Sequence, residues 1–179
     1  ADYGLLHNLM KLIQNSKKAK LQLVITGMHL ESKFGNTYKE INNDGFNIDY
    51  KVKLNLKSDD PSSINRATAE AIIGLSKVYV RLKPDLVVLL GDRFETFCAA
   101  QSSMILNIPI AHLHGGESTE GSVDEAIRHS ITKMSHFHFV STNKYKNRVI
   151  QMGENKNNVS CVGSLILENL EEKKLFSKN

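Results

Sequence analysis

Apolar residues are spaced along the chain in two alternating patterns. Short runs rich in apolar residues, typical of buried parallel strands, occupy residues 21–26, 48–54, 86–90, 108–114, 136–140 and 159–163. Helical spacing of apolar residues occurs at residues 3–15, 64–83, 94–106, 122–134 and 143–152. Strands thus alternate with helices, which predicts an α/β fold: a Rossmann-like parallel sheet with helices on both faces.

The strand at residues 86–90 ends in a glycine and a charged pair, Asp92 and Arg93. Ligands of open α/β sheets bind beyond the carboxyl ends of the strands, so we expect this pair at the mouth of a binding crevice. Asp92 is therefore a candidate for chemistry. The alternative is that Asp92 only caps the next helix by accepting backbone N–H bonds.

A second polar cluster follows residues 108–114. Two histidines precede a Gly-Gly pair and Glu117, and a loop then leads to Asp124 and a helix. Because the strands of a parallel sheet end at one edge, we expect this cluster to face Asp92. The alternative is a glycine-rich turn with solvated charges, but few loops bring so many titratable residues together.

Length and composition narrow the class of protein. A chain of 179 residues fits one domain with a core of its own. The net charge of +4 comes from scattered lysines, so we expect no nucleic-acid partner, whereas an anionic small molecule fits. Two isolated cysteines, Cys98 and Cys161, and the lack of a long apolar run predict a cytoplasmic protein without a membrane partner.

Five of the seven histidines fall within a short span, which raises the question of a metal site: His112, His114, His129, His136 and His138. Histidines two residues apart on a strand point to one face, as metal binding requires. The two such pairs lie on different strands, however, and no carboxylate joins either pair at a recognised ligand spacing. We therefore predict neither a metal nor another cofactor.

Six short motifs follow one another along the chain: residues 1–6 (ADYGLL), 26–30 (TGMHL), 34–38 (FGNTY), 91–95 (GDRFE), 112–117 (HLHGGE) and 124–129 (DEAIRH). In this order they resemble the hydrolysing UDP-N-acetylglucosamine 2-epimerases of sialic-acid and related nonulosonic-acid biosynthesis. The resemblance extends over almost the whole chain, and several motifs in order are more specific than any one of them.

The resemblance implies one half of a two-domain enzyme of the GT-B type, with the active site between the domains. Residues 1–170 match the N-terminal Rossmann-like domain without the strand that usually comes first. Residues 171–179 lead toward a second domain, which in the family holds most of the nucleotide. We therefore expect the intact enzyme to be active, and to be a homo-oligomer, whereas the isolated chain is expected to be an inactive fragment.

Family chemistry eliminates UDP across C1 and C2 of the sugar to give a glycal, to which water then adds. The product is the 2-epimer, which is N-acetylmannosamine when the substrate is UDP-N-acetylglucosamine. The implied partner is thus a UDP-sugar, either UDP-N-acetylglucosamine or a 2,4-diacetamido trideoxy sugar. The alternatives are a non-hydrolysing 2-epimerase and a non-catalytic sugar-nucleotide-binding domain.

By the same resemblance, the expected catalytic residues are Asp92, Glu117 and Asp124. The expected substrate-binding residues are Asp2, His29, Arg93, His114, Gly115, Gly116, Arg128 and His129. The two arginines would neutralise phosphate charge by forked hydrogen bonds, or else form salt bridges with neighbouring carboxylates. Relatives often carry glutamate at the position of His114, so either Glu117 takes that role or His114 acts as a neutral base or hydrogen-bond donor.

Overall fold

The computed structural model describes residues 2–31, 36–56 and 58–166, and helices alternate with strands through these ranges. The α-helices are α1 (Asp2–Gln14), α2 (Tyr38–Asn43), α3 (Pro61–Leu82), α4 (Phe94–Ile105), α5 (Val123–Met134) and α6 (Asn143–Gln151). The strands are β1 (Val24–Thr26), β2 (Tyr50–Val52), β3 (Val87–Leu90), β4 (Ile110–Leu113), β5 (Phe137–Val140) and β6 (Val159–Cys161). The described ranges also contain two short 3₁₀ helices, η1 (Gly27–Leu30) and η3 (Lys156–Asn158). The first half of the motif at residues 34–38 and the tail at residues 171–179 lie outside the described residues.

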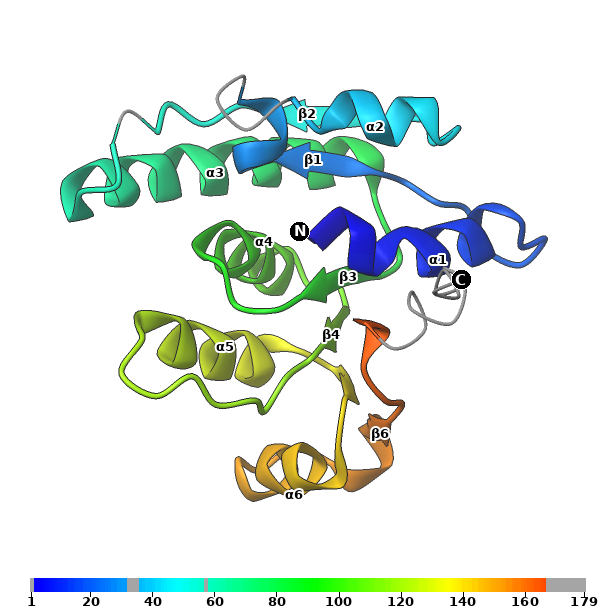
Figure 1. The fold of residues 1–179 in the computed structure, drawn as a ribbon, viewed down its shortest axis with the longest axis vertical. Coiled ribbons are helices and arrows are strands. Elements are labelled where there is room, and N and C mark those ends of the chain that lie inside the picture. The colour runs from blue at the N-terminus through cyan, green and yellow to red at the C-terminus, as the bar shows by residue number, and fades with distance from the viewer. Residues whose placement is uncertain (1, 32–35, 57, 167–179) are drawn as a thin grey trace, which may run out of the picture.

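Every strand pairs in parallel with its neighbour, which confirms the predicted α/β fold. The strands form two sheets, one of order β1-β2 and one of order β3-β4-β5-β6 (Figure 1). Within the described ranges no hydrogen-bonded ladder joins β1 to β3. Helix α3, which has 22 residues, carries the chain from β2 of the small sheet to β3 of the larger one. Such a crossover is needed wherever consecutive strands run in parallel.

Helices cover the two sides of the strands differently. α3, α4 and α5 share a core with β3 and β4, and this core includes Ala71, Leu75, Leu89 and Ile110. α1 and α2 pack around Ile25 of β1 in a second core. Figure 1 shows α3, α4, α5 and α6 on one side of the strands and α1 on the other. The small sheet therefore lies between helical layers, as the sequence predicts.

Helix α3 shows how the sequence defines one element. Asp60 caps its first turn by accepting the backbone N–H groups of Ser62 and Ser63, each at 3.0 Å, and Pro61 occupies the first helical position. Most of the predicted apolar stripe of the helix is buried, including Ala67 and Val78, while Ile72 and Leu82 are half-buried. No helix in the described ranges is both long enough and apolar enough to span a membrane.

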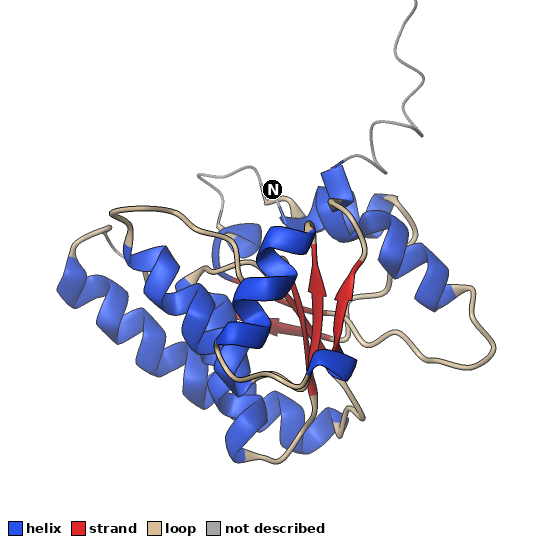
Figure 2. Ribbon diagram, turned by 90° about the horizontal axis from the view of Figure 1, so that it is seen from below, coloured by secondary structure: helices blue, strands red, loops and turns tan. Residues whose placement is uncertain are grey.

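Parallel pairing brings the carboxyl ends of β3, β4 and β5 to one edge (Figure 2). In the register of the sheet, Leu90 of β3 lies beside Leu113 of β4, which in turn lies beside Phe139 of β5. The residues that follow each strand are consequently neighbours, although 20 or more positions separate them in the sequence. This edge holds the candidate site.

Candidate functional site

Asp92 follows β3 and the left-handed turn at Gly91, where φ is +78°. Its carboxylate oxygen Oδ2 accepts a hydrogen bond from Nη2 of Arg128 on α5, and Arg128 Nη1 donates to Thr119 Oγ1 at 3.0 Å. The pair is largely shielded from water, since the Arg128 and Asp92 side chains are 9% and 20% exposed. The N-cap of α4 is Arg93, so the interpretation of Asp92 as a helix cap is wrong. The two predicted clusters do face each other.

The surroundings of Asp92, taken together, disfavour the charged form of its carboxyl group. Burial raises the pKa of Asp92 above its ordinary value, while the Arg128 guanidinium opposes that rise. The carboxylates of Asp124, Glu117 and Asp2 act on Asp92 in the same direction as burial. The other two predicted catalytic carboxylates, Asp124 and Glu117, therefore each lie within electrostatic reach of Asp92.

The loop after β4 is tightly packed. His114 adopts a left-handed conformation with φ +61°, and Gly116 follows with φ +76°. A Cβ atom on Gly115 would lie 2.9 Å from His112 Nδ1, and one on Gly116 would lie 2.8 Å from the carbonyl oxygen of Tyr145. Glycine is required at both positions because a side chain has no room there. The expected substrate contacts of these glycines stay a prediction.

Glu117 is held by hydrogen bonds from two sides. Ser141 Oγ donates to Glu117 Oε1 at 2.7 Å, and His114 Nδ1 lies 3.2 Å from the same oxygen. Burial alone would raise the pKa of Glu117, yet the bonds from His114 and Ser141 outweigh burial and lower it. Glu117 is thus a carboxylate that keeps its charge, next to Asp92, whose pKa moves upward.

The end of β1 reaches the same region from the smaller sheet. His29 Nδ1 lies 2.7 Å from Thr37 Oγ1, and burial lowers the pKa of His29 although Asp2 opposes the change. Asp2 therefore acts electrostatically on both His29 and Asp92. A Cβ on Gly27 would collide with the carboxylate of Glu95, so the two sheets meet closely here.

Both predicted phosphate-binding arginines form salt bridges with carboxylates of the protein. Arg93 makes a forked contact with Glu95, at 3.3 Å from Nε to Oε2 and 3.3 Å from Nη2 to Oε1. The Arg93 side chain is still 40% exposed, whereas Arg128 is shielded beside Asp92. Arg93 is consequently the better placed of the two to reach a ligand.

Two predicted site residues, Asp124 and His129, lie in the first two turns of α5. Asp124 follows the N-cap Ser122, whose Oγ accepts the Asp124 backbone N–H at 3.2 Å. His129 lies one turn further along, with Nε2 3.8 Å from Glu125 Oε1. Glu125 in turn accepts the backbone N–H of Thr119 at 3.0 Å. His129 therefore lies beside Glu125, which binds the loop that precedes α5, and the expected role of His129 in substrate binding stays a prediction.

Among the clustered histidines, His112 and His136 form hydrogen bonds with protein groups. His112 is fully buried, with Nε2 2.9 Å from the Gly91 carbonyl oxygen and Nδ1 3.2 Å from Thr132 Oγ1. His138 Nε2 lies 3.2 Å from Glu154 Oε2. Burial lowers the pKa of His112 to about 4, so the ring is neutral. Among the described residues, no three His, Cys, Asp or Glu side chains gather around a point that could hold a metal ion.

Three residues of the site were not singled out from the sequence. They are Glu95, which binds Arg93, Thr119, which binds Arg128, and Ser141, which binds Glu117. Ser141 directly follows β5, so the strand-end rule that identifies Asp92 also identifies Ser141. Glu95 and Thr119 carry no such signal: Glu95 lies in the first turn of α4 only two residues from Arg93, and Thr119 lies in the loop nine residues before Arg128.

The fold and the site together define an α/β domain whose carboxyl edge presents carboxylates, arginines and a glycine loop. This chain belongs to the UDP-N-acetylglucosamine 2-epimerase family, whose model matches residues 11–179. The resemblance seen in the ordered motifs is thereby confirmed.

Curated relatives match almost the whole chain. The chain is 46% identical over 165 residues to the GDP/UDP-N,N'-diacetylbacillosamine 2-epimerase (hydrolyzing) of Campylobacter jejuni. This match covers 92% of the chain and 43% of the relative. The chain is also 40% identical over 179 residues to the UDP-N,N'-diacetylbacillosamine 2-epimerase (hydrolyzing) of Legionella pneumophila. That match covers 100% of the chain and 47% of the relative. The chain thus spans somewhat under half the length of these relatives.

Solved structures share the fold. The Methanocaldococcus jannaschii UDP-GlcNAc 2-epimerase in complex with UDP-GlcNAc and UDP superimposes with a TM-score of 0.83 at 23% identity, covering 98% of this chain and 48% of that one. The Neisseria meningitidis UDP-GlcNAc 2-epimerase bound to UDP-GlcNAc gives a TM-score of 0.81 at 22% identity, with 97% and 48% covered. The chain therefore has the fold of one half of such enzymes.

Proposed function

We propose that this chain forms the N-terminal half of a hydrolysing UDP-sugar 2-epimerase. The observation that carries the proposal is a pair of carboxyl groups at one sheet edge, Asp92 and Glu117, whose pKa values move in opposite directions. Such a pair supplies two carboxyl groups with different tendencies to take up a proton, as acid–base chemistry at a single carbon requires. The hydrolysing relatives support the same activity.

The reaction has two balanced steps. First a carboxylate removes the proton from C2 of the sugar, the electron pair forms the C1–C2 double bond, and the bond from C1 to the UDP oxygen breaks. Water then adds to this glycal, with oxygen bonding at C1 and a proton returning to the opposite face of C2. The sum is UDP-sugar plus water giving UDP plus the free 2-epimer.

The residues divide these tasks by their surroundings. We assign acid–base work on the sugar to Asp92, Glu117 and Asp124, since their carboxyl groups interact electrostatically. Arg93, with an exposed guanidinium, is the proposed contact for the negative charge that develops on the departing UDP. Asp2 and His29 lie on the side of the smaller sheet and are proposed to bind the substrate.

The identity of the sugar is proposed from the relatives. The two relatives described above carry the name of N,N'-diacetylbacillosamine epimerases, and a UDP-N-acetylglucosamine 2-epimerase of Neisseria meningitidis is 32% identical over 164 residues. We therefore rank UDP-N,N'-diacetylbacillosamine, a 2,4-diacetamido trideoxy sugar, ahead of UDP-N-acetylglucosamine. Both carry the 2-acetamido group and the UDP leaving group that the mechanism uses.

We infer that a further parallel strand completes the domain between β1 and β3. Each sheet consists of parallel strands, and no ladder joins β1 to β3 in the described part of the chain. The close approach of Gly27, after β1, to Glu95, after β3, nevertheless brings the carboxyl ends of these two strands together. We also propose that the second half of the protein holds most of the UDP. Direct pairing of β1 with β3 in the intact protein would refute the first proposal, and micromolar UDP binding by the isolated 179-residue chain would refute the second.

We propose in addition that the intact protein is a cytoplasmic homo-oligomer. Large apolar side chains are exposed on α3 and α4, namely Ile73, Val80, Met104 and Ile105, and exposed apolar surface favours association. Sedimentation of the intact protein checks this: a single species with the mass of one chain at micromolar concentration would refute it.

The test of the function is turnover by the intact protein. Purified enzyme is incubated with UDP-N,N'-diacetylbacillosamine or with UDP-N-acetylglucosamine, and both UDP release and the sugar product are followed by NMR. We expect one UDP per free sugar, with the product inverted at C2. A UDP-sugar product that keeps its nucleotide would instead favour the non-hydrolysing alternative, and binding without turnover would favour a sugar-nucleotide-binding domain.

A further inference from the structure

The backbone at His114 is held in an unfavourable conformation. With φ +61°, His114 lies in the left-handed region, which is uncommon for residues other than glycine, although histidine enters it more often than most. Its backbone N–H donates to the carbonyl oxygen of Phe139 at 2.9 Å, which anchors the turn to β5. Such strain persists where the surroundings fix it, and it commonly orients a functional side chain.

Both ring nitrogens of His114 have partners within the protein. Nε2 lies 3.5 Å from the backbone nitrogen of Leu165, and because a backbone N–H can only donate, Nε2 must accept and carry no proton. Nδ1 faces Glu117 Oε1 at 3.2 Å and therefore carries a proton that it can donate to the carboxylate. This arrangement uses the ring fully, with one nitrogen accepting and the other donating.

Ser141 and His114 both contact the same carboxylate oxygen of Glu117, Oε1. Ser141 Oγ donates to Oε1 at 2.7 Å, and His114 Nδ1 points to the same atom. In the described part of the chain no hydrogen bond reaches Oε2. Side chains of the two adjoining loops thus hold one edge of the carboxylate and leave its other edge available to a ligand.

The loop between His114 and Glu117 is fixed as well. Arg148 Nη1 on α6 donates to the carbonyl oxygen of Gly116 at 2.7 Å, and Gly115 packs against His112 and Thr132. A rigid loop, rather than an adaptable one, carries the carboxylate. Fixed orientation of a reacting group is worth orders of magnitude in rate.

We infer that His114 and Ser141 are positioning residues that orient Glu117 toward the sugar, and that Glu117, not His114, exchanges protons with the substrate. This inference rests on the proposed epimerase function, and it decides between the two roles that the sequence left open for His114. His114 uses its two ring nitrogens on Glu117 and the backbone N–H of Leu165, and Ser141 uses its one proton on Glu117, so neither residue is assigned proton transfer with the substrate.

The first test compares variants of the intact enzyme. Ser141→Ala is expected to lower kcat about tenfold or more with KM changed less than about twofold, since one bond to a charged group is lost. It also moves the acidic limb of the kcat–pH profile to higher pH, because the lost bond stabilised the ionised carboxylate. Ser141→Thr keeps the hydroxyl and restores both, and Ser130→Ala on the exposed side of α5 is the matched control. An unmoved pH limb in Ser141→Ala overturns the inference.

The second comparison separates positioning from proton transfer at His114. His114→Asn keeps a donor near the place of Nδ1 and tolerates the left-handed backbone, but has no basic nitrogen. We expect it to retain kcat within about fivefold, whereas His114→Ala loses about tenfold or more. Equal losses of about a hundredfold or more in both variants would make His114 a proton-transfer group and overturn the inference.

A measurement independent of turnover keeps the two proposals distinguishable. Long-range ¹H–¹⁵N NMR of the intact protein at neutral pH identifies the protonated ring nitrogen of His114. We expect a proton on Nδ1 and none on Nε2, even if no UDP-sugar is turned over and the proposed function fails. A proton on Nε2, or on both nitrogens, overturns the positioning role whatever the activity.

Discussion

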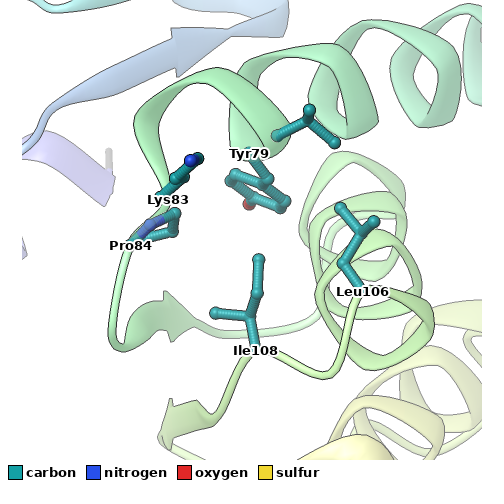
Figure 3. A pocket seen from close by; sticks show the side chains of 6 residues that line it. Tyr79, Lys83, Pro84, Leu106 and Ile108 are labelled. Atoms are coloured by element: carbon teal, nitrogen blue, oxygen red, sulfur yellow. The ribbon is translucent and has the colours of Figure 1, made fainter.

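The two ends of the same β-strands differ in almost every chemical respect. At the carboxyl ends lie the ion pair of Asp92 with Arg128 and the bonded group of His114, Glu117 and Ser141. At the amino ends of β3 and β4 there is an open hollow of about 290 Å³ between the ends of α3 and α4 (Figure 3). It is lined by Tyr79, Val80, Lys83, Pro84, Leu106 and Ile108.

This difference shows where the fold can support chemistry. The hollow offers apolar surface with one lysine, so it lacks the opposed acid and base groups that proton transfer needs. At the carboxyl edge, left-handed turns at Gly91 and His114 redirect the chain at once and bring side chains of separate loops together. The same strands thus carry a packed, apolar end and a charged, reactive end.

The largest expected effect comes from Asp92→Asn in the intact enzyme. Asparagine keeps the shape but removes the charge beside Arg128, so kcat should fall about a hundredfold or more while KM changes little. The matched control is Asp85→Asn, which removes an exposed aspartate at the opposite end of the same strand and should leave kcat within about twofold. Steady-state kinetics decide the point, and unaltered turnover of Asp92→Asn would remove Asp92 from the mechanism.

The next effect concerns the contact between the two sheets. Gly27→Ala places a Cβ against the carboxylate of Glu95 and also forces alanine into a left-handed φ of +60°, so we expect a loss of about 2 kcal/mol in the free energy of unfolding. Gly45→Ala is the control, because φ there is +85° but nothing lies within 4 Å of the added atom. Denaturant unfolding should show a clearly smaller loss for Gly45→Ala, and equal losses would mean that the sheets do not meet at Glu95.

A smaller effect follows from the charge on Glu117. The pKa of this carboxyl is lowered in the folded protein, so its ionised form contributes stability above the ordinary pKa of 4.5, and the contribution is lost as pH falls through the lowered pKa. Glu117→Gln should therefore cost about 1 kcal/mol near neutral pH and progressively less in acid. Thermal unfolding of both proteins between about pH 3 and pH 7 tests this, and a difference that grows in acid would reverse the assignment.

The smallest effect is expected in the apolar hollow. Val80→Ser alters a side chain that is 60% exposed, so the free energy of unfolding should change by less than about 0.5 kcal/mol and kcat by less than about twofold. Kinetics of this variant beside Asp92→Asn measure the contrast between the two ends directly. A large loss of turnover in Val80→Ser would show that the amino ends also serve the reaction.

Much of the fold follows from local sequence. Pro84 and Gly91 bracket the aliphatic run of β3, and Asp60 with Pro61 marks the start of α3, so the boundaries of these elements are predictable to within a few residues. The 3₁₀ helix η1 was missed because a Gly-Met-His stretch carries no helical spacing. Local patterns identify elements well where strong breakers flank them.

The site is predictable in its location but not in its pairings. The rule that ligands bind beyond strand ends locates Asp92 and Glu117, and it also covers Ser141. It does not reveal that Arg128 binds Asp92, or that His112 bonds the Gly91 carbonyl instead of a metal, because both contacts join residues more than 20 positions apart. Such pairs are set by tertiary packing, which spacing along the chain does not encode.

The central claim is that the carboxyl edge moves a proton at C2 of a UDP-sugar. The intact enzyme is therefore allowed to convert UDP-N,N'-diacetylbacillosamine, and in parallel UDP-N-acetylglucosamine, in heavy water, and the free sugar product is examined by NMR and mass spectrometry. We predict one deuterium at C2 of the 2-epimer, since the proton removed in the elimination is replaced from solvent. A 2-epimer that forms with its original hydrogen at C2 would contradict the account.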